Sequence, residues 1–333
     1  MTRITGIAAL CVAACAAAPD QSTAQQAFMS LQGTQLQGVQ LQGSVASKSL
    51  LGFQFSGATL NGASLDNLRI EQGGLAAEQG GTTLRGTSLS HAHVFAQVQS
   101  GGTTTLVEYK FDDIASEDTT RYDPTQTGGT YLYTILQNVD DTGWAPACGA
   151  DVDGQHVAIP MSATWNSHGD RVESSTLFTF ACTTAVVAKC YRWGYRPWVT
   201  GHGDLTAAHW SCTRMARADY CGSGHSHTHD GTQINFWDSL PAPGPIDGRG
   251  SPPLGMLFEA GWNTQGAVCL SHARWLLGGP IIALGCPGRL IAPGLGLLGA
   301  TVCDVVADVL GQDATSAIFD ESNLNLNLDV LGL

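Results

Sequence analysis

The chain has 333 residues, and its 15 basic and 28 acidic side chains give a formal net charge of −13 at pH 7. This charge would repel a phosphate backbone, so nucleic acid is excluded as an expected partner. Only 13% of the residues are charged, and 41 are glycine. Such a composition is typical of a turn-rich β protein and not of a helical bundle or a disordered acidic tail.

Residues 1–15 predict an export signal that ends at a lipid-modified cysteine. Arg3 precedes an apolar run that is too short to span a bilayer, as is typical of a signal peptide. The run ends in Val-Ala-Ala-Cys, which resembles a bacterial lipobox, so we expect cleavage before Cys15 and a diacylglycerol on its thiol. The exported protein would then be lipid-anchored at the outer membrane or cell surface. The alternative is plain secretion after cleavage behind Ala18, although Pro19 disfavours that cut.

The cysteines predict an oxidising compartment. Of the ten cysteines, Cys11 lies in the signal peptide and Cys15 is the lipid site, which leaves eight. An even number in an exported chain favours four disulfides. The alternatives are free buried thiols or a thiolate metal site, although the sequence has no CxxC pair. The pairing stays open among Cys148, Cys182, Cys190, Cys212, Cys221, Cys269, Cys286 and Cys303.

After a linker over residues 16–27, residues 28–89 carry an apolar residue at every fifth position. Leucine recurs with this spacing in LQGTQLQGVQLQGS, and the register returns in FSGATLNGASLDNLRIEQGGL. A period of five fits neither a helix nor a strand. It resembles the pentapeptide-repeat family, whose coils form a square β-solenoid. The alternative is a pair of irregular β-hairpins with a glycine turn every fifth residue. In both cases we expect a spacer or docking surface and not a reaction centre.

Residues 90–333 predict a disulfide-rich α+β domain. Alternating residues in HVFAQVQ, TTTLVEYKFDDI and TYLYTILQN are typical of antiparallel strands, and HVAIPMSATW and STLFTFAC predict a second pair. Two helices should follow, one capped by Thr183 or Thr184 and the other by Asp204. Strands followed by helices favour an α+β architecture. The expected fold is therefore β-rich, disulfide-bonded and α+β, preceded by the short pentapeptide-repeat-like β segment.

Two motifs in this region resemble a known bacterial family. They are WGYRPW at 193–198 and CTRMARADYCGSGHSHTHDGT at 212–232, which contains the letters ADYC at 218–221. Together they resemble the ADYC domain, a family of secreted proteins and lipoproteins. The resemblance implies export but brings no reaction with it, so the chemistry has to be considered from the residues themselves.

The second motif offers a candidate metal site. His225, His227 and His229 alternate, so an extended segment would place three imidazoles on one face. Zinc, nickel or copper could bind there with further ligands from elsewhere in the chain. The alternative is a solvent-exposed loop, because GSGHSHTHDGT is rich in turn-forming residues. Beyond this candidate divalent metal, no cofactor is expected.

Three carboxylates are candidates for acid–base chemistry. Asp219 could act as a general base beside Arg214 or Arg217. Glu259 could form a glycosidase-like acid pair with Asp230. The alternative for Asp219 is a structural role, in which its carboxylate binds backbone amides in the turn that places the neighbouring cysteine.

Two functions remain open for the exported domain. Its aromatic residues could stack on sugars or grip peptides if they are exposed, or they could form the core if they are buried. The first function is a lipoprotein without catalysis that binds an envelope protein or polysaccharide. The second is a secreted hydrolase, with or without a metal, whose site lies near the ADYC and HSHTHDG motifs. The aromatic residues are Trp193, Tyr195, Trp198, Trp210, Trp237 and Trp262.

Overall fold

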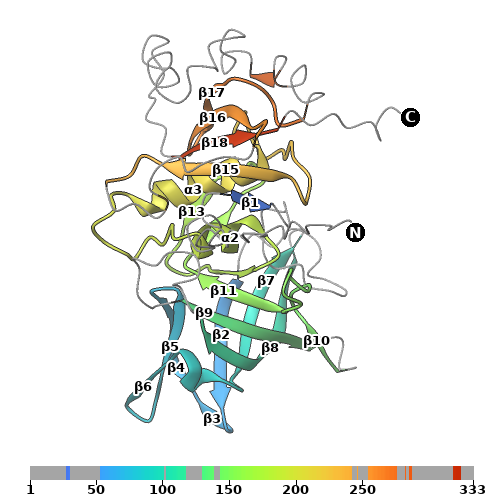
Figure 1. Cartoon of the computed structure of the whole chain (residues 1–333). Coiled ribbons are helices and arrows are strands. Elements are labelled where there is room, and N and C mark those ends of the chain that lie inside the picture. The colour runs from blue at the N-terminus through green and yellow to red at the C-terminus, as the bar shows by residue number, and fades with distance from the viewer. Residues whose placement is uncertain are drawn as a thin grey trace, which may run out of the picture.

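The computed structural model describes residues 28–30, 53–100, 103–117, 130–138, 143–241, 246, 254–275, 282, 285–286 and 318–323. Within these residues the chain forms two large antiparallel sheets, two small ones and two α-helices. Figure 1 shows the helices between the two large sheets. The fold is therefore the β-rich α+β architecture that the sequence predicts.

The larger sheet has eight strands in the order β14-β11-β9-β8-β7-β2-β3, with β10 paired to β9. Every pairing is antiparallel. Buried residues alternate along β9, because successive side chains of a strand point to opposite faces. The strands predicted from HVFAQVQ, TTTLVEYKFDDI and TYLYTILQN are confirmed as β7, β8 and β9. The eight strands are β2 (Phe53–Leu60), β3 (Ala63–Ser64), β7 (His93–Ser100), β8 (Thr103–Ser116), β9 (Tyr131–Asn138), β10 (Trp144–Pro146), β11 (Val157–Met161) and β14 (Thr179–Cys182).

Residues 53–89 form antiparallel hairpins, so the solenoid interpretation of this segment is wrong and the hairpin alternative is found instead. β2 turns back into β3, and a three-stranded antiparallel meander follows, whereas a solenoid would stack parallel coils. The period of five still marks inward residues, since Leu60, Leu65 and Leu75 are buried. The repeat at 31–43 lies outside the described residues. The meander consists of β4 (Asp66–Glu71), β5 (Gly74–Gln79) and β6 (Thr82–Arg85), and the 3₁₀ helix η1 (Gly86–Leu89) follows it.

The second large sheet joins segments from both ends of the chain, in the order β1-β15-β18-β16-β17. β1 comes from the predicted repeat segment and pairs with β15, while β18 lies in the centre between β15 and β16. Since β2 belongs to the larger sheet, residues 28–89 contribute to both large sheets. The predicted division at residue 89 is therefore not a boundary between them. The five strands are β1 (Phe28–Ser30), β15 (Gln233–Asp238), β16 (Leu257–Asn263), β17 (Gly266–Leu270) and β18 (Ile318–Ser322).

The two helices connect the sheets. α2 (Val186–Arg192) contacts β14 of the larger sheet, and α3 (Leu205–Arg217) contacts β16, β17 and β18 of the smaller one. The helices also contact each other. A short antiparallel hairpin of β12 (Ala163–Trp165) and β13 (Arg171–Glu173) lies between β11 and β14 in the sequence.

One of the two expected helix caps is confirmed. The Asp204 carboxylate accepts hydrogen bonds from two backbone N–H groups in the first turn of α3, as an N-cap residue does. The expected cap of α2 is wrong, because that helix begins after Ala185, which provides no side-chain cap. The Thr183 hydroxyl instead donates to the Asp151 carboxylate at 2.8 Å, so a tertiary contact has replaced the local one.

Replacing Asp204 with alanine should lower the free energy of unfolding by about 1 kcal/mol, because two backbone amides of α3 lose their acceptor. Urea denaturation of the wild type and Asp204→Ala measures the loss. Asp204→Asn is the matched control and should keep most of the stability, since asparagine also caps helices. Equal stability of wild type and Asp204→Ala would contradict the prediction.

Disulfides between described residues fasten the helices and the segment after them. One joins the chain before β11 to β14, one joins α2 to α3, and one holds the residues that follow α3. Cys269 is disulfide-bonded as well. The predicted oxidation of these cysteines is confirmed, while Cys15 and Cys303 lie outside the described residues. The pairs are Cys148–Cys182, Cys190–Cys212 and Cys221–Cys286.

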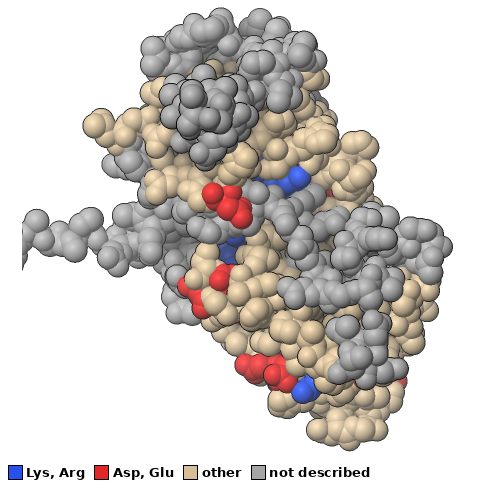
Figure 2. Space-filling model, turned by 90° about the vertical axis from the view of Figure 1, so that its right-hand side faces the viewer, with Lys and Arg blue, Asp and Glu red and all other residues tan. Residues whose placement is uncertain are grey.

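Charged side chains are sparse among the described residues on one face of the molecule. Figure 2 shows one face of the molecule, on which acidic side chains form small separate groups and basic side chains are few. Among the described residues, no helix has the length and apolar character needed to cross a bilayer.

Candidate functional site

The ADYC motif begins where α3 ends. Ala218 closes the helix in a left-handed conformation with φ of 51°, and its backbone N–H donates to the carbonyls of Arg214 and Met215. The backbone N–H of Asp219 also donates to the Arg214 carbonyl, at 2.9 Å. Such a left-handed residue satisfies the last helical carbonyls and reverses the chain. The motif therefore folds back against α3.

Asp219 is fully buried within this turn. Its carboxylate accepts hydrogen bonds from the backbone N–H groups of Ser223 at 3.0 Å and Gly224 at 2.9 Å. It also accepts from Arg214 Nη1 at 2.6 Å, and Arg214 Nη2 reaches Asp170 at 2.6 Å. The structure thus places Asp219 in the structural role that the sequence left as the alternative. Its oxygens are used by the turn and by Arg214.

The motif packs tightly on the hairpin of β16 and β17. The backbone N–H of Ala267 donates to the carbonyl of Tyr220 at 2.9 Å. Gly266 has φ of 108°, a value that favours glycine. A Cβ on Gly266 would also lie against the backbones of Asp219, Tyr220 and Gly222. The hairpin turn therefore requires glycine both for its conformation and for the close approach.

Glu259 lies in a second buried ionic network. Arg274 donates to both Glu259 oxygens at 2.9 Å and to Asp320 at 2.8 Å, and all three side chains are 0% exposed. The Tyr220 hydroxyl donates to Glu259 at 2.9 Å, and Trp262 Nε1 donates to Asp320 at 2.8 Å. This network joins the ADYC motif to β16 and β18. Like Asp219, Glu259 is thereby tied to an arginine inside the fold.

The contribution of Asp320 to the stability of the fold is expected to fall as pH rises. Burial raises the pKa of Asp320 well above its ordinary value, and the charge of Glu259 raises it further. When the pKa of a carboxyl group is higher in the folded state than in the unfolded state, the group stabilises the fold at low pH. This stabilisation is complete at pH values below the unfolded-state pKa, which is about 3.9. That stabilisation is lost as pH rises through the folded-state pKa.

Urea denaturation between about pH 4 and pH 8 checks this expectation by the linkage of protonation to folding. The wild type should lose stability relative to Asp320→Asn as pH rises, because the amide does not ionise. A difference in free energy that stays constant across this range would contradict the assignment to Asp320.

The three candidate metal-binding histidines lie in different surroundings. His225 is exposed, and His229 is exposed with its ring 4.8 Å from the ring of Trp275. His227 is half-buried, with Nδ1 3.0 Å from the carbonyl oxygen of Ala218. In the part of the chain that the structure describes, no group of three or more His, Cys, Asp or Glu side chains is arranged to hold a metal ion.

The sequence-predicted residues are therefore not brought together into one cleft. Asp219 and Glu259 belong to separate buried networks, and Asp230 is exposed. Among the aromatic candidates, Trp193, Trp237 and Trp262 are core residues. Trp198 differs from these three residues, because it lines a pocket.

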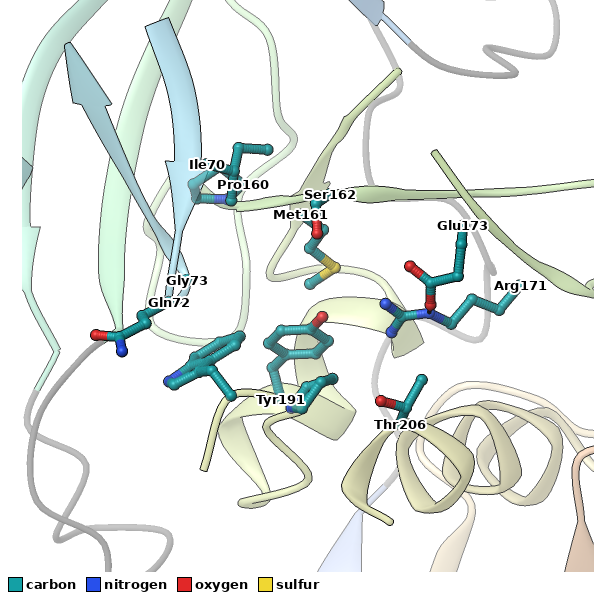
Figure 3. Close-up of a pocket in the computed structure, with 12 residues that line it drawn as sticks. Ile70, Gln72, Gly73, Pro160, Met161, Ser162, Arg171, Glu173, Tyr191 and Thr206 are labelled. Atoms are coloured by element: carbon teal, nitrogen blue, oxygen red, sulfur yellow. Dashed lines mark hydrogen bonds and ion pairs between the residues drawn. The ribbon is translucent and has the colours of Figure 1, made fainter. Parts of the chain in front are cut away.

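This pocket has a volume of about 400 Å³ and is drawn in Figure 3. Its walls come from the β4–β5 turn, the end of β11, β13, α2, the WGYRPW segment and the first turn of α3. The volume falls within the roughly 300–1,000 Å³ that is usual for small-molecule sites. The lining residues are Ile70, Gln72, Gly73, Pro160, Met161, Ser162, Arg171, Glu173, Tyr191, Pro197, Trp198 and Thr206.

Arg171 supplies the positive charge of the pocket. Its side chain is 6% exposed, and its Nε donates to Glu173 at 2.7 Å. In Figure 3 the guanidinium points toward Tyr191. Its buried Nη1 has no hydrogen-bond partner among the described residues. A buried donor without a partner costs about 1–3 kcal/mol, and more if it is charged. The same guanidinium lies 5.9 Å from the centre of the Trp165 ring, so it is held inside the fold beside the pocket.

An aromatic pair forms the opposite side of the pocket. The rings of Tyr191 and Trp198 lie 5.2 Å apart with an interplanar angle of 48°. His209 packs behind Tyr191 at 4.2 Å, and its Nε2 lies 3.0 Å from the carbonyl oxygen of Val187. Burial lowers the pKa of His209 to about 3 and raises the pKa of Tyr191, so both rings are neutral at neutral pH.

The β4–β5 turn closes one end of the pocket and is fixed to the larger sheet. Gln72 and Gly73 have φ of 48° and 74°, as a tight two-residue hairpin turn requires. Two residues further on, the backbone N–H of Leu75 donates to the Tyr133 hydroxyl oxygen at 2.7 Å in a buried hydrogen bond. The turn is therefore held in place by β9.

Sequence reasoning missed most of this pocket. A signal for part of it was present, because Arg171 and Glu173 are two residues apart on a strand and so share one face. Trp198 was considered only as one member of an aromatic group. No local pattern relates Gln72 or Met161 to them, since these residues meet only through the pairing of distant strands.

The fold and its disulfides define an extracytoplasmic α+β protein with a preformed pocket, because multiple disulfides form and persist in oxidising compartments. A model of the ADYC domain matches residues 82–276, so the chain belongs to the ADYC domain family. The match includes the pocket residues from β11 to α3 but not those of the β4–β5 turn. No curated protein matches the chain, and no solved structure does.

Proposed function

We propose that the chain is an exported, non-catalytic binding protein, held at the outer membrane or cell surface by lipid on Cys15, and that the pocket at Arg171 holds its ligand. The observation that carries this proposal is the pocket of about 400 Å³, whose lining includes the Arg171–Glu173 ion pair. Envelope components are the expected source of the ligand, because an anchored protein meets them first.

Two further observations support binding at this place. The lining of the pocket is mainly polar, and the rings of Tyr191 and Trp198 lie beside its polar groups. Two of the three carboxylates considered for catalysis are bound elsewhere, since Asp219 pairs with Arg214 and Glu259 pairs with Arg274. Their role in the fold explains their presence without a reaction.

Thermal unfolding with a ligand panel tests the binding function. The mature chain without residues 1–15 is heated with neutral oligosaccharides, acidic oligosaccharides and short peptides of the envelope. We expect at least one class to raise the midpoint temperature of the wild type and not that of Arg171→Met, because a ligand stabilises the state that binds it. Arg85→Met is the matched control, since Arg85 is 58% exposed on β6, and it should respond like the wild type. A panel without effect, or an equal effect on Arg171→Met, would overturn the proposal.

Detergent phase partitioning tests the anchor. The full-length protein should enter the detergent phase after expression in a bacterial host, because two acyl chains give stable membrane attachment. Cys15→Ser should remain in the aqueous phase. Cys11→Ser is the matched control within the signal peptide and should partition like the wild type. Equal partitioning of Cys15→Ser and the wild type would show that lipid on Cys15 is not the anchor.

A further inference from the structure

We infer that the Cys221–Cys286 disulfide is a site of thiol–disulfide exchange, which an exported dithiol of the C-x-x-C class reduces while the protein stays folded. The bridge is not part of the pocket lining, so this chemistry goes beyond the proposed binding function. Three features of the bridge support it: its exposure, the open space beside one of its sulfur atoms, and the contacts that remain when it is broken.

The Cys221–Cys286 bridge is more exposed than the other two disulfides whose partners are both described. Cys221 and Cys286 are each half-buried, whereas the four cysteines of the other two bridges are at most 1% exposed. A thiolate must reach a sulfur atom to exchange with it, so access controls the rate. Cys148–Cys182 and Cys190–Cys212 therefore need the fold to open before they react, and Cys221–Cys286 does not.

Gly285 leaves space beside one sulfur atom of the bridge. This residue is exposed, and a Cβ on it would lie 3.6 Å from the Sγ of Cys221, which is an ordinary contact distance. Because glycine has no side chain, a reagent can occupy this space next to the sulfur. We therefore assign Cys221 Sγ as the attacked atom and Cys286 as the thiolate that leaves.

The two thiols of the reductant balance the reaction. The first, as a thiolate, bonds to Cys221 Sγ while the S–S bond breaks, and the electron pair of that bond stays on the Cys286 sulfur, which takes up a proton. The second then attacks the mixed disulfide, closes the disulfide of the reductant and releases Cys221 as a thiol. Two electrons and two protons pass from the dithiol to the bridge. Thiol–disulfide oxidoreductases of oxidising compartments carry such dithiols.

The turn of the ADYC motif has other contacts that hold it when the bridge is open. Asp219 keeps its two hydrogen bonds from backbone amides of the turn and its ion pair with Arg214. The Tyr220 carbonyl keeps the hydrogen bond from the backbone N–H of Ala267 at 2.9 Å. Reduction therefore unties residues 285–286 from the turn while the described sheets and helices stay folded. The bridge is a redox-controlled tie between the motif and the segment after β17.

Timed reduction of the mature chain without residues 1–15 tests the accessibility of the bridge. The folded protein is exposed to dithiothreitol at neutral pH, free thiols are alkylated at intervals, and the labelled peptides are identified by mass spectrometry. Cys221 and Cys286 should be labelled at least about tenfold faster than the cysteines of Cys148–Cys182 and Cys190–Cys212, because exposed disulfides are the labile ones. The near-ultraviolet circular dichroism should be retained while only this bridge is open. Equal rates for the three bridges, or a signal lost in step with the labelling, would overturn the inference.

Gly285→Leu tests the attacked atom. The leucine side chain fills the space beside Cys221 Sγ, so the labelling of this bridge should slow severalfold, while the two buried bridges keep their rates. Gly57→Leu is the matched control and should react like the wild type, because Gly57 on β2 also has open space around its Cβ position and neither glycine has a positive φ. An unchanged rate in Gly285→Leu would overturn the assignment of Cys221 Sγ.

A trapped intermediate tests the class of reductant without any change in this chain. Thioredoxin whose second active-site cysteine is replaced by serine cannot resolve a mixed disulfide, so it stays bonded to the cysteine that it attacks. We expect a covalent adduct on Cys221 with Cys286 free for alkylation, identified by peptide mapping after a non-reducing gel. An adduct on a buried bridge would overturn the site, and one on Cys286 would overturn the attacked atom. The absence of any adduct would overturn the dithiol as the reductant.

Discussion

Replacing Arg274 with methionine is expected to lower the free energy of unfolding by about 3–5 kcal/mol, because breaking a buried ion pair leaves an uncompensated charge. Glu259 and Asp320 would lose the guanidinium that lies 2.9 and 2.8 Å from their oxygens, and both carboxylates are 0% exposed. Methionine fills a similar space, so the loss reports the ionic contacts more than an empty cavity. Urea denaturation at neutral pH measures it.

The same variant has a distinctive dependence on pH. Burial raises the pKa of Asp320, so this carboxyl is protonated at acidic pH, and a neutral acid is less costly to bury than an ion. The difference between wild type and Arg274→Met should therefore shrink as pH falls. The matched control is Arg69→Met, whose side chain is 30% exposed and pairs with Glu71 on the surface. Its loss should stay below about 1 kcal/mol. A loss of that size for Arg274→Met would refute the importance of the network.

Asp219→Ala is expected to cost about 3 kcal/mol or more. The substitution leaves Arg214 Nη1 and the backbone N–H groups of Ser223 and Gly224 without their common acceptor. Each buried donor without a partner costs about 1–3 kcal/mol, although relaxation and water reduce the sum. The free energy of unfolding from urea denaturation gives the loss.

Asp170→Ala is a matched control for Asp219→Ala, because Asp170 binds the same guanidinium from a position where its side chain is 40% exposed. Solvent can replace that carboxylate, so the expected loss is about 1 kcal/mol or less. If the two variants lost equal stability, the hydrogen bonds of Asp219 to the turn would not contribute more than the exposed contact of Asp170. A small loss for both would mean that Arg214 finds other partners.

The local parts of this fold could be predicted from the sequence. Alternation placed β7, β8 and β9, and the side chain of Asp204 marked the start of α3, because both signals depend on neighbouring residues. The cysteine count indicated oxidation but not the pairing. Pairing depends on which segments meet in space, as for Cys190 and Cys212 on the two helices.

The parts that failed depend on distant contacts. The period of five in residues 53–89 correctly marked buried leucines, yet it could not show that β2 pairs with β7. The candidate site failed for a related reason. Asp219 and Glu259 look reactive in a sequence, and only the positions of Arg214 and Arg274 show that both are structural ion-pair partners. Arg171 became a candidate because it lines the pocket, whose walls come from segments that are distant in the sequence.

The central position of β18 has a consequence for the order in which an exported chain can mature. Export delivers the N-terminal end first, so β15, β16 and β17 emerge before residues 318–322. Until then, β15 and β16 each present an open edge of the kind that invites aggregation. Arg274 and Trp262 also lack the hydrogen bonds that they donate to Asp320 until that residue has emerged. The sheet is therefore complete only after β18 has emerged. A product truncated before β18 is expected to keep these edges open, to be prone to aggregation and to be accessible to proteases.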